Sequence, residues 1–451
     1  MNREIFREYD IRGLVGTHLT EEVVRDIGRA FATYMRERGR TRASVGRDCR
    51  LSSDSFGALV TEGMLSGGLS VIDLGVVPTP VFYYSLFNLD VEGGIMVTGS
   101  HNPPEYNGFK IAFGKSTLFG AEVQEIGNIM EARRFVSGTG SVHGHGQIRE
   151  EYADYLKRHV SIDRGLKVVV DGGSGTGGEI ACPIMEDLGQ TVVPLFCEMD
   201  GRFPYHFPDP TVEKNLVDLK RTVVRTSADL GIGYDGDADR IGVVDETGKV
   251  IWGDYLMIIF ARDILKTNKG ASFVSEVKCS KNLFAVIEKH GGRPIMWKAG
   301  HSLIKQKMKE VHAVLGGEMS GHMFFADRFF GFDDAIYASL RLLEILGREG
   351  KKLSQLLDDL PPAFSTPEIR IECPEELKFR AVKRLTAHYR ERFPIVDTDG
   401  VRVTLPGGWG LVRASNTQPI LVLRFEADSP EALDRVRTLV TEDLEWVMKE
   451  A

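Results

Sequence analysis

The sequence predicts an α/β protein with three related α/β domains and a smaller α+β domain at the C-terminal end. Three observations lead to this prediction. The chain has 451 residues, which is too many for one ordinary domain. Short apolar stretches alternate with helical patterns, and this order recurs as a weak internal repeat. After a proline-rich stretch the pattern changes to strands joined by short turns.

Each repeat contains the same succession of elements. An opening apolar strand is expected at 43–46, 166–170 and 272–275. A helix that passes through glycine into a second strand is expected at 65–74, 185–195 and 287–297. A later strand that ends in a polar loop is expected at 95–97, 230–234 and 313–315. Ligands of such folds collect beyond the carboxyl ends of the strands, so the three polar loops are predicted to line one cleft.

The C-terminal part follows a different order. Its helices are expected at 374–392 and from Pro430 onward, with Ser429 as the N-cap, and its strands at 401–405, 409–412 and 420–425. The prolines between Pro361 and Pro367 favour a linker, because consecutive prolines prevent a helix. The expected domains are therefore residues 1–145, 146–248, 249–362 and 363–451.

Composition excludes several classes of function. The net charge is −8 and no basic block stands out, which argues against nucleic acid or an anionic membrane as a partner. The five cysteines form no CxxC pair, so a zinc site or a disulfide framework is not expected. No apolar run approaches the about 18 to 20 residues that span a bilayer, and the N-terminus has no signal-peptide core. These observations predict a cytoplasmic protein.

Three aspartates at alternate positions form the strongest candidate metal site. Asp235, Asp237 and Asp239 follow a predicted strand, and their carboxylates would repel one another unless a cation lies among them or some stay protonated. Ligation by oxygen alone favours Mg²⁺, Mn²⁺ or Ca²⁺ over zinc. An EF-hand is excluded, because Arg240 stands where its glycine is required and the flanks resemble strands. The alternative is a solvated acidic turn.

Ser100 is the candidate nucleophile. It follows a strand and precedes His101, Asn102 and two prolines, and Lys110 adds a cation that could steer a phosphate or exchange a proton. A Ser-His-Asp hydrolase is disfavoured, because no GxSxG elbow is present and His101 adjoins Ser100 rather than facing it. By itself the segment would also fit an ordinary turn.

Other polar loops suit a phosphorylated sugar. Residues 317–322 offer Glu318, Ser320 and His322 to hydroxyl groups, and Arg413 precedes Ser415, Asn416 and Thr417 in a loop that could hold a phosphate. Further candidate contacts, each of which could instead be a solvated side chain, are Tyr9, Asp10, Arg12, Lys278, Lys298 and His301.

A glycine-rich loop gives a competing hypothesis. Gly173, Gly175 and Gly178 match the GxGxxG pattern between a strand and a helix, and Glu198 stands about where a ribose-binding acid would follow. The chain is rich in glycine, however, and shows no site for hydride transfer. Dinucleotide binding therefore remains only an alternative.

Taken together, the motifs resemble those of the α-D-phosphohexomutase family, and in particular its bifunctional phosphomannomutase/phosphoglucomutase branch. The resemblance covers nearly the whole chain and rests on five motifs in order: Tyr9–Gly13, Thr98–Pro103, Asp235–Arg240, Gly317–His322 and Arg413–Thr417. Met319 is also typical of the mannose/glucose branch, since the phosphoglucosamine branch usually has glutamine there. Small departures occur at Ala335, where glycine is frequent, and at Gln418, where a small residue is common.

The resemblance implies three α/β domains and a TATA-binding-protein-like fourth around one central cleft. It implies an isomerase in which Ser100 rests as phosphoserine, Mg²⁺ is bound by its phosphate with Asp235, Asp237 and Asp239, and a hexose 1,6-bisphosphate is the intermediate. Lys110, Arg12 and His101 would assist the transfer. The implied substrate contacts are Tyr9, Arg240, Lys278, His301, Glu318, Ser320, His322, Arg413, Ser415, Asn416 and Thr417. The family branch also suggests a monomer.

Three alternatives remain open at this point. A metal-dependent sugar phosphatase would release the phosphoryl group to water, a phosphoglucosamine mutase would use another sugar, and a sugar-phosphate sensor would bind without turnover. Formation of glucose 6-phosphate from glucose 1-phosphate would separate the mutase from the phosphatase.

Overall fold

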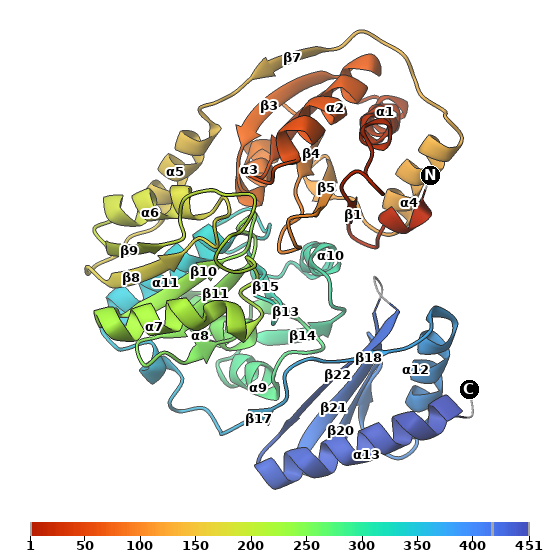
Figure 1. Ribbon diagram of the computed structural model, residues 1–451. Coiled ribbons are helices and arrows are strands. Elements are labelled where there is room, and N and C mark those ends of the chain that lie inside the picture. The colour runs from red at the N-terminus through yellow and green to blue at the C-terminus, as the bar shows by residue number, and fades with distance from the viewer. Residues whose placement is uncertain (1, 416–418, 450–451) are drawn as a thin grey trace.

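Four separate sheets form the framework of the protein in the computed structural model, which describes residues 2–415 and 419–449. Figure 1 shows the four sheets with their helices in an arc, with the N-terminal domain at one end and the C-terminal domain at the other. The first three sheets contain parallel strands, whereas the fourth is antiparallel throughout. The predicted fold class is confirmed.

The first domain is built on a seven-stranded sheet with the order β1-β5-β4-β2-β3-β7 and β6 beside β5. Strand β4 is buried on both faces: Ile95 and Val97 join the apolar layer of α1, α2 and α4, and Met96 joins the layer of α3. This alternation follows from the two-residue period of a strand. The elements are η1 (Arg3–Ile5), β1 (Ile11–Leu14), α1 (Glu21–Glu37), β2 (Arg42–Arg47), α2 (Ser53–Ser66), β3 (Ser70–Val76), α3 (Thr79–Asn88), β4 (Gly93–Val97), β5 (Tyr106–Phe113), β6 (Ser116–Thr117), α4 (Ala121–Glu131) and β7 (Ser141–Gly144).

The second domain has a five-stranded sheet in the order β12-β11-β10-β8-β9. Strand β8 lies between β9 and β10 and is parallel to both, whereas β11 returns antiparallel beside β10. The hairpin from β10 to β11 carries the three aspartates at its turn. The elements are α5 (Ile148–His159), β8 (Lys167–Asp171), α6 (Gly178–Asp187), β9 (Thr191–Leu195), η2 (Glu213–Leu216), α7 (Val217–Thr226), β10 (Leu230–Tyr234), β11 (Ile241–Asp245) and β12 (Val250–Ile251).

The third domain has a four-stranded sheet in the order β14-β13-β15-β16. Its last parallel strand begins at Leu315 rather than at Ala313, because His312 ends α10 in the left-handed region and pairing with Phe273 of β13 starts only at Leu315. The elements are α8 (Gly253–Thr267), β13 (Ser272–Glu276), α9 (Lys281–Lys289), β14 (Arg293–Trp297), α10 (His301–Val311), β15 (Leu315–Gly317), β16 (Met323–Phe325), α11 (Ala335–Glu349) and η3 (Ser354–Leu356).

The fourth domain has a six-stranded antiparallel sheet in the order β17-β22-β21-β20-β19, with β18 also paired to β22. Figure 1 shows α12 and α13 on one side of this sheet, and their apolar residues form the domain's own core with it. As predicted, Ser429 caps α13 through the backbone N–H of Ala432 (3.2 Å). The elements are β17 (Phe364–Ser365), β18 (Ile369–Glu372), α12 (Glu375–Arg390), β19 (Ile395–Val396), β20 (Val401–Leu405), β21 (Gly408–Ala414), β22 (Ile420–Ala427) and α13 (Pro430–Lys449).

Three short strands of the fourth domain were not predicted, namely β17, β18 and β19. Strand β17 lies inside the proline-rich stretch that the sequence assigns to a linker. Prolines are tolerated there because β17 lies at the edge of the sheet. The chain therefore enters the fourth sheet earlier than the change in composition suggests.

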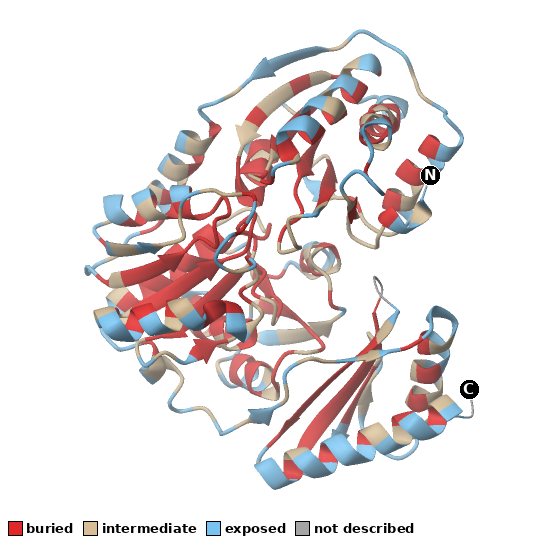
Figure 2. Ribbon diagram, in the orientation of Figure 1, coloured by how far each residue is buried: buried red, intermediate tan, exposed pale blue. Residues whose placement is uncertain are grey.

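Apolar cores distinguish the first three domains from the fourth. One large cluster of buried side chains runs through parts of the first, second and third domains, and Figure 2 shows the central strands of these domains as largely buried, whereas the edge strand β7 is exposed. The fourth domain has a separate core. Among the described residues, no helix combines the length and apolar character needed to cross a bilayer.

Candidate active site

The loop after β4 holds Ser100 in a buried and strained conformation. Ser100 is 3 % exposed and has a φ of 50°, a backbone region that residues other than glycine rarely adopt. The buried guanidinium of Arg50 donates to the carbonyl oxygens of Ser100 (2.7 Å) and Asn102 (2.6 Å). A Cβ on Gly99 would lie 2.5 Å from Arg50 Cζ, so a larger residue there would displace the guanidinium that holds this loop. Such strain is typical of functional loops.

The turn between β10 and β11 places Asp235 directly beside Ser100. The hydroxyl of Ser100 donates to Asp235 Oδ2 (2.8 Å), and Asp235 Oδ1 accepts the backbone N–H groups of Asp239 and Arg240 (3.1 Å each). Ala238 lies in the left-handed region (φ 56°), which lets the turn wrap around its own carboxylates. The structure thus brings together two segments that the sequence separates by more than a hundred residues.

Lys110 supplies a cation to the other two aspartates. It lies on β5, is 5 % exposed, and its ammonium donates to Asp237 Oδ2 (2.6 Å) and to Asp239 Oδ2. Burial by itself lowers the pKa of Lys110, but Asp237 and Asp239 raise it well above its ordinary value. The repulsion expected among the aspartates is therefore offset by a charged lysine in this conformation.

The three carboxylates also fit a divalent cation. One oxygen from each lies within 4.8 Å of the others. Asp237 Oδ1 and Asp239 Oδ1 are buried and have no hydrogen-bond partner among the described residues. Burial, together with Asp239 and Asp237, raises the pKa of Asp235 well above its usual range. Buried acceptors left unpaired are costly, and a hard cation held by oxygen ligands would satisfy them.

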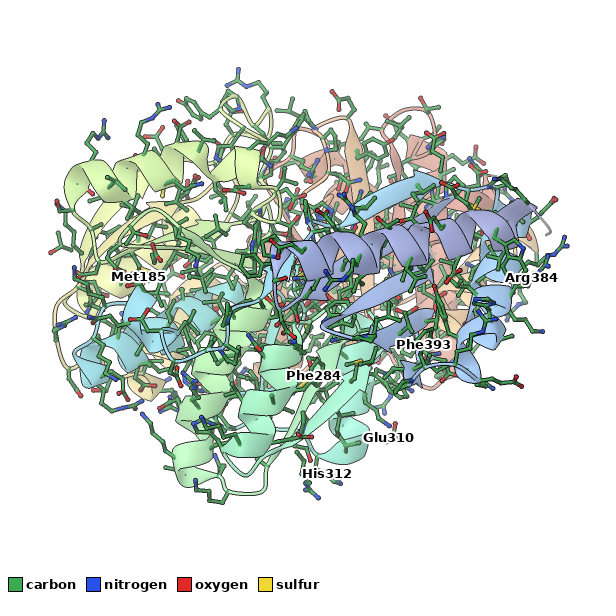
Figure 3. All side chains as sticks on the ribbon, turned by 90° about the horizontal axis from the view of Figure 1, so that it is seen from below. Met185, Phe284, Glu310, His312, Arg384 and Phe393 are labelled. Carbon is green, nitrogen blue, oxygen red and sulfur yellow. The ribbon has the colours of Figure 1, made fainter. Side chains whose placement is uncertain are left out.

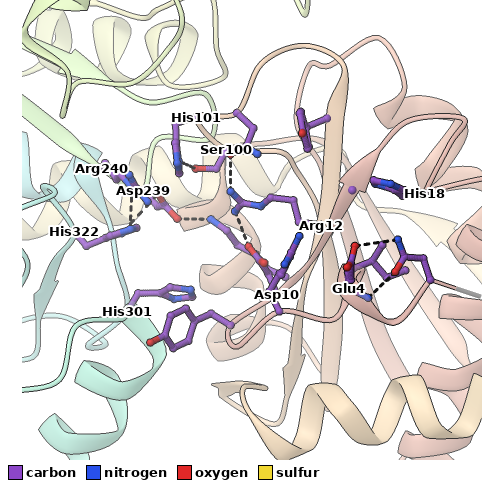
Figure 4. A pocket seen from close by; sticks show the side chains of 18 of the residues that line it. Glu4, Asp10, Arg12, His18, Ser100, His101, Asp239, Arg240, His301 and His322 are labelled. Carbon is purple, nitrogen blue, oxygen red and sulfur yellow. Dashed lines mark hydrogen bonds and ion pairs between the residues drawn. The ribbon is translucent and has the colours of Figure 1, made fainter. Parts of the chain in front are cut away.

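A cavity of about 420 Å³ opens beside this cluster. Figure 4 shows side chains from the first, second and third domains pointing into it. Arg370 of the fourth domain also lines it. Of the residues predicted from the sequence, it is lined by Tyr9, Asp10, Arg12, Ser100, His101, Lys110, Asp239, Arg240, His301 and His322.

Four histidines line this cavity, and three of them, His101, His301 and His322, have a lowered pKa. Burial, followed by nearby cations, lowers the pKa of His101, His301 and His322 well below its ordinary value. His101 Nδ1 lies 3.1 Å from Ser100 Oγ. The expectation that His101 would not face Ser100 is therefore wrong, because the turn at Ser100 brings the neighbouring ring back over the hydroxyl.

A second group of predicted residues lies beyond the cavity, toward the fourth domain. Glu318 Oε1 accepts the backbone N–H of Gly300 (2.7 Å), and burial and Glu276 raise the pKa of Glu318 to about 7. Ser320 is half-buried in the turn that Gly321 N–H closes onto Glu318 O (3.0 Å). Lys278 lies near Glu276 Oε2 (3.4 Å) and Glu368 Oε2 (3.2 Å). These groups can bind the hydroxyls and the charge of a sugar phosphate.

The fourth domain carries the predicted phosphate loop. Arg413 is buried, and its Nε donates to Asp399 Oδ2 (3.0 Å), which also accepts the backbone N–H of Ala299 (3.0 Å). Ser415 is buried, and its carbonyl oxygen accepts from Lys378 Nζ (2.6 Å). The remaining predicted residues of this loop, Asn416 and Thr417, lie outside the described residues.

Sequence reasoning missed three residues of the site. Thr79 donates its hydroxyl to Asp237 Oδ2 (2.6 Å), Arg50 holds the Ser100 loop, and Arg370 reaches the cavity from β18. Thr79 and Arg50 both follow strands of the first sheet, so their position at the carboxyl ends was a usable signal. Arg370 gave no such signal, because β18 itself was not predicted.

The glycine-rich loop between β8 and α6 has a structural role. All residues from 172 to 178 are buried, and Thr176 donates its N–H to Gly236 O (3.0 Å). A Cβ on Gly175 would lie 2.6 Å from the same carbonyl oxygen. The glycines let this loop pack closely against the turn that carries Asp235 and Asp237. That turn occupies the space beside the loop where a pyrophosphate would have to bind.

The fold and this site are those of an enzyme that transfers a phosphoryl group. The chain belongs to the phosphoglucomutase/phosphomannomutase family, and it is an isomerase. The family's four domains match in order: α/β/α domain I over residues 3–137, domain II over 150–248, domain III over 252–364 and the C-terminal domain over 368–442.

Individual relatives agree over nearly the whole chain. A phosphomannomutase/phosphoglucomutase of Pseudomonas aeruginosa is 47% identical over 98% of this chain and 96% of its own length. A phosphoglucomutase of Neisseria gonorrhoeae is 44% identical over 97% of this chain and 96% of its own. The crystal structure of a family member from Burkholderia thailandensis superposes with a TM-score of 0.94 at 40% identity, covering 99% of this chain and 98% of that one. The resemblance stated from the motifs is confirmed.

Proposed function

We propose that this protein interconverts the 1-phosphates and 6-phosphates of glucose and of mannose, with Ser100 as the group that gives and takes the phosphoryl unit. The observation that carries the proposal is the contact between Ser100 Oγ and Asp235 Oδ2 (2.8 Å), beside Lys110 and two further carboxylates. Phosphoryl transfer depends mainly on positioning and on neutralising charge, and this cluster supplies both.

The transfer breaks one phosphorus–oxygen bond and forms another. In the first half, the bond from phosphorus to Ser100 Oγ breaks, and a bond to the free sugar hydroxyl forms, giving a hexose 1,6-bisphosphate. Ser100 Oγ gains a proton as the hydroxyl loses one. The neutral imidazole of His101, 3.1 Å from Ser100 Oγ, is placed to exchange that proton. The second half reverses these changes with the other phosphate.

Cations around the serine stabilise the charge of the transferred group. Arg12 is oriented by Asp10 Oδ2 (2.6 Å) and Asn102 Oδ1 (2.7 Å) and lines the cavity. Lys110 contributes its charge rather than a proton. We propose that Asp235, Asp237 and Asp239, with the phosphate on Ser100, hold Mg²⁺, which when bound would withdraw charge from the phosphoryl oxygens.

Each of the four domains contributes one part of the site in this proposal. The first supplies Ser100, the second the aspartates, the third the sugar loop and the fourth the phosphate loop. Glu318 and Ser320 grip two sugar hydroxyls, and the non-reacting phosphate is held from the fourth domain. The other proposed contacts are Tyr9, Arg240, Lys278, His301, His322, Arg413, Ser415, Asn416 and Thr417.

The bisphosphate turns end for end between the two half-reactions, so each phosphate occupies each end of the site once. Hydroxyls that are identical in glucose and mannose carry the recognition, so either sugar can bind. We also propose the cytoplasm as the location, because all five cysteines are free thiols, which fits a reducing compartment.

Replacing Ser100 with alanine tests the proposal. We expect Ser100→Ala to lose at least about a thousandfold in conversion of glucose 1-phosphate to glucose 6-phosphate, followed by a coupled assay with a trace of hexose 1,6-bisphosphate and MgCl₂. Calorimetry should still detect sugar-phosphate binding. The matched control is Ser85→Ala, a buried serine on α3 that bonds Ser44 and Phe82 O and should keep turnover.

Two outcomes would contradict the proposal. Undiminished turnover by Ser100→Ala would exclude a phosphoserine route. Release of inorganic phosphate in place of glucose 6-phosphate by the natural protein would identify a phosphatase.

A further inference from the structure

Asp333 is a buried carboxylate that contacts Lys305 and lies near two histidines of the cavity wall, His301 and His322. It immediately precedes the N-cap of α11, Asp334, and is fully buried. Its Oδ1 accepts from Lys305 Nζ (2.8 Å). Its Oδ2 lies 3.5 Å from His322 Nδ1 and 3.7 Å from His301 Nδ1. Oδ2 has no hydrogen-bond partner within the described part of the chain, and neither has His322 Nδ1.

The other nitrogen of His322 fixes where its proton lies. Arg240 Nε donates to His322 Nε2 (3.0 Å), and Figure 4 shows this pair at the cavity wall. An arginine Nε–H can only donate, so Nε2 must accept. The neutral imidazole therefore carries its proton on Nδ1, and this buried donor needs an acceptor.

Two carboxylates are near enough to take that proton in a hydrogen bond. Asp239 Oδ1 lies 3.7 Å from His322 Nδ1, slightly farther than Asp333 Oδ2. Each carboxylate pairs with a lysine through its other oxygen, but Asp239 Oδ1 lies farther from His322, and we propose Asp239 as a metal ligand. Asp333 is left as the acceptor, and a shift of a few tenths of an ångström brings the pair into hydrogen-bond range.

The same geometry excludes a second metal site here. Asp239, His322 and Asp333 also have ligand atoms within 4.8 Å of one another. A protonated Nδ1 cannot ligate a metal, however, and Nε2 is taken by Arg240. The charge of Asp333 is already paired with Lys305.

We propose that Asp333 is a positioning residue of the active site: it accepts the Nδ1 proton of His322, and so turns Nε2 toward Arg240 and aims that guanidinium into the cavity. The tautomer of His322 is inferred from its contacts with Arg240 and Asp333, whereas the effect of that tautomer on turnover rests on the proposed mutase function. Carboxylates that orient histidines in this way are common behind metal ligands, where losing them typically costs about 10 to 100-fold in activity.

The variant Asp333→Asn tests this chain of contacts sharply. Lys305 can only donate, so it should hold the amide oxygen of the asparagine. The amide NH₂ would then face His322 Nδ1, where two donors oppose each other. His322 must move its proton to Nε2 or turn away, and either response breaks the bond from Arg240.

The primary measurement is the tautomer of His322 from side-chain ¹⁵N–¹H correlation spectra of the full-length protein without substrate. His322→Gln assigns the signal. We expect a proton on Nδ1 in the natural protein and its loss from Nδ1 in Asp333→Asn. The matched control is Asp334→Asn, because Asp334 is equally buried but bonds Tyr152 and the Tyr337 N–H. That control should leave the His322 signal unchanged.

Kinetics then test whether Asp333 acts through His322. We expect kcat/KM of Asp333→Asn to fall about tenfold, and the double variant with His322→Gln to be no worse than His322→Gln alone. Adding Lys305→Met to Asp333→Asn frees the amide to turn its oxygen to His322, and should restore both tautomer and rate.

A proton on His322 Nε2 in the natural protein would overturn the proposal, as would fully multiplicative effects of Asp333→Asn and His322→Gln. If Asp333→Asn fails to fold, the tautomer of the natural protein decides by itself. The spectra need no turnover, so failure of the mutase function would appear separately, as an expected tautomer in an inactive protein.

Discussion

The active site has two halves that are held in different ways: a rigid half around Ser100 in the first three domains, and a second half in the fourth domain. Around Ser100, parts of the first three domains share one apolar cluster, beside a further core of the first domain, and their contacts join buried groups such as Ser100 with Asp235 and Thr79 with Asp237. The fourth domain has its own core, and a small cluster of Val277, Trp409 and Leu411 lies between it and the third.

Polar contacts form much of the boundary between the third and fourth domains. Arg402 donates to the carbonyl oxygens of Val277 (2.6 Å) and Cys279 (2.7 Å), and Arg424 donates to Lys278 O (2.6 Å). Figure 3 shows Phe284 of α9, whose ring lies 5.7 Å from the Arg402 guanidinium, on the side of the third domain that faces the fourth.

This difference suggests a division of labour. Chemistry needs its groups fixed in place, and a shared apolar core provides that rigidity. A bisphosphate that rotates end for end must be released and bound again between the two half-reactions. A domain attached through polar contacts suits this requirement, because such interfaces permit relative motion.

The largest effect is expected from removing the cation at the centre of the rigid half. In Lys110→Met, Asp237 and Asp239 lose their buried partner. Breaking a buried ion pair typically costs about 3–5 kcal/mol, so chemical denaturation without divalent ions should show a large loss of stability. Turnover should fall at least about a hundredfold, because charge in the transition state is no longer offset.

Magnesium chloride should restore much of the stability of Lys110→Met but not its activity. The matched control is Lys115→Met, an exposed lysine on the same hairpin, which should behave like the natural protein. A Lys110→Met protein with natural stability in the absence of metal would show that the three aspartates do not depend on this lysine.

The stability of the protein should depend on pH through Asp334, which lies where the second and third domains meet. Tyr152 of α5 donates its hydroxyl to Asp334 Oδ2 (2.8 Å), and burial raises the pKa of Asp334 from 3.8 to about 7. The folded protein then holds a proton that the unfolded chain has lost, so stability falls as pH rises from about 4 to 7. The loss is on the order of 4 kcal/mol, since the pKa rises by about three units and each unit corresponds to about 1.4 kcal/mol.

Asp334→Asn should flatten this dependence, measured as the free energy of unfolding in urea at several pH values. The exposed Asp434→Asn serves as the control, since Asp434 pairs only weakly with Arg437 on α13. Equal pH slopes for Asp334→Asn and the natural protein would mean that Asp334 is charged throughout.

The next variant loosens the fourth domain without touching the rigid half. Arg402 is buried, stacks on Trp409 at 3.6 Å, and donates to two carbonyl oxygens of the third domain. In Arg402→Met these oxygens lose their donor. We expect KM for glucose 1-phosphate to rise about tenfold, which corresponds to about 1.4 kcal/mol, with a much smaller change in kcat.

Solution X-ray scattering should show a larger radius of gyration for Arg402→Met. The matched control is Arg437→Met, an exposed arginine of the same domain, which should change neither quantity. A fall in kcat with KM unchanged would place the fourth domain in the chemical step and remove the distinction between the halves.

The two halves also differ in how far the sequence revealed them. The repeat placed Ser100 and Asp235 at equivalent strand ends, and that equivalence predicted their meeting. The roles of Lys110 and His101 were less accessible. The two carboxylate partners of Lys110 come from another domain, and the contact of His101 with Ser100 accompanies a strained φ at Ser100 that sequence patterns do not encode.

The fourth domain was harder to predict because its decisive contacts are long-range and its missed strands are short. Strands β17 and β19 have two residues each, too few for a periodic pattern. The pairing of Arg413 with Asp399, and of Asp399 with Ala299, joins segments that no local signal connects. Propensity located the helices α12 and α13, whose long amphipathic faces carry a strong pattern.

The smallest effect is expected at Arg370, the cavity residue contributed by β18. Its side chain is 64% exposed and pairs with Glu368 Oε1 (3.0 Å), so solvent and salt screen its charge. Arg370→Met should raise KM for glucose 1-phosphate about threefold at low ionic strength, as expected for an exposed charge worth under about 1 kcal/mol. The effect should shrink as NaCl is added, whereas the effect of Arg402→Met should persist, because Arg402 is buried.

A salt-independent loss in Arg370→Met would mean that this arginine is desolvated against the substrate in the working enzyme. The fourth domain would then close over the cavity far enough to bury a residue that is exposed in the present conformation.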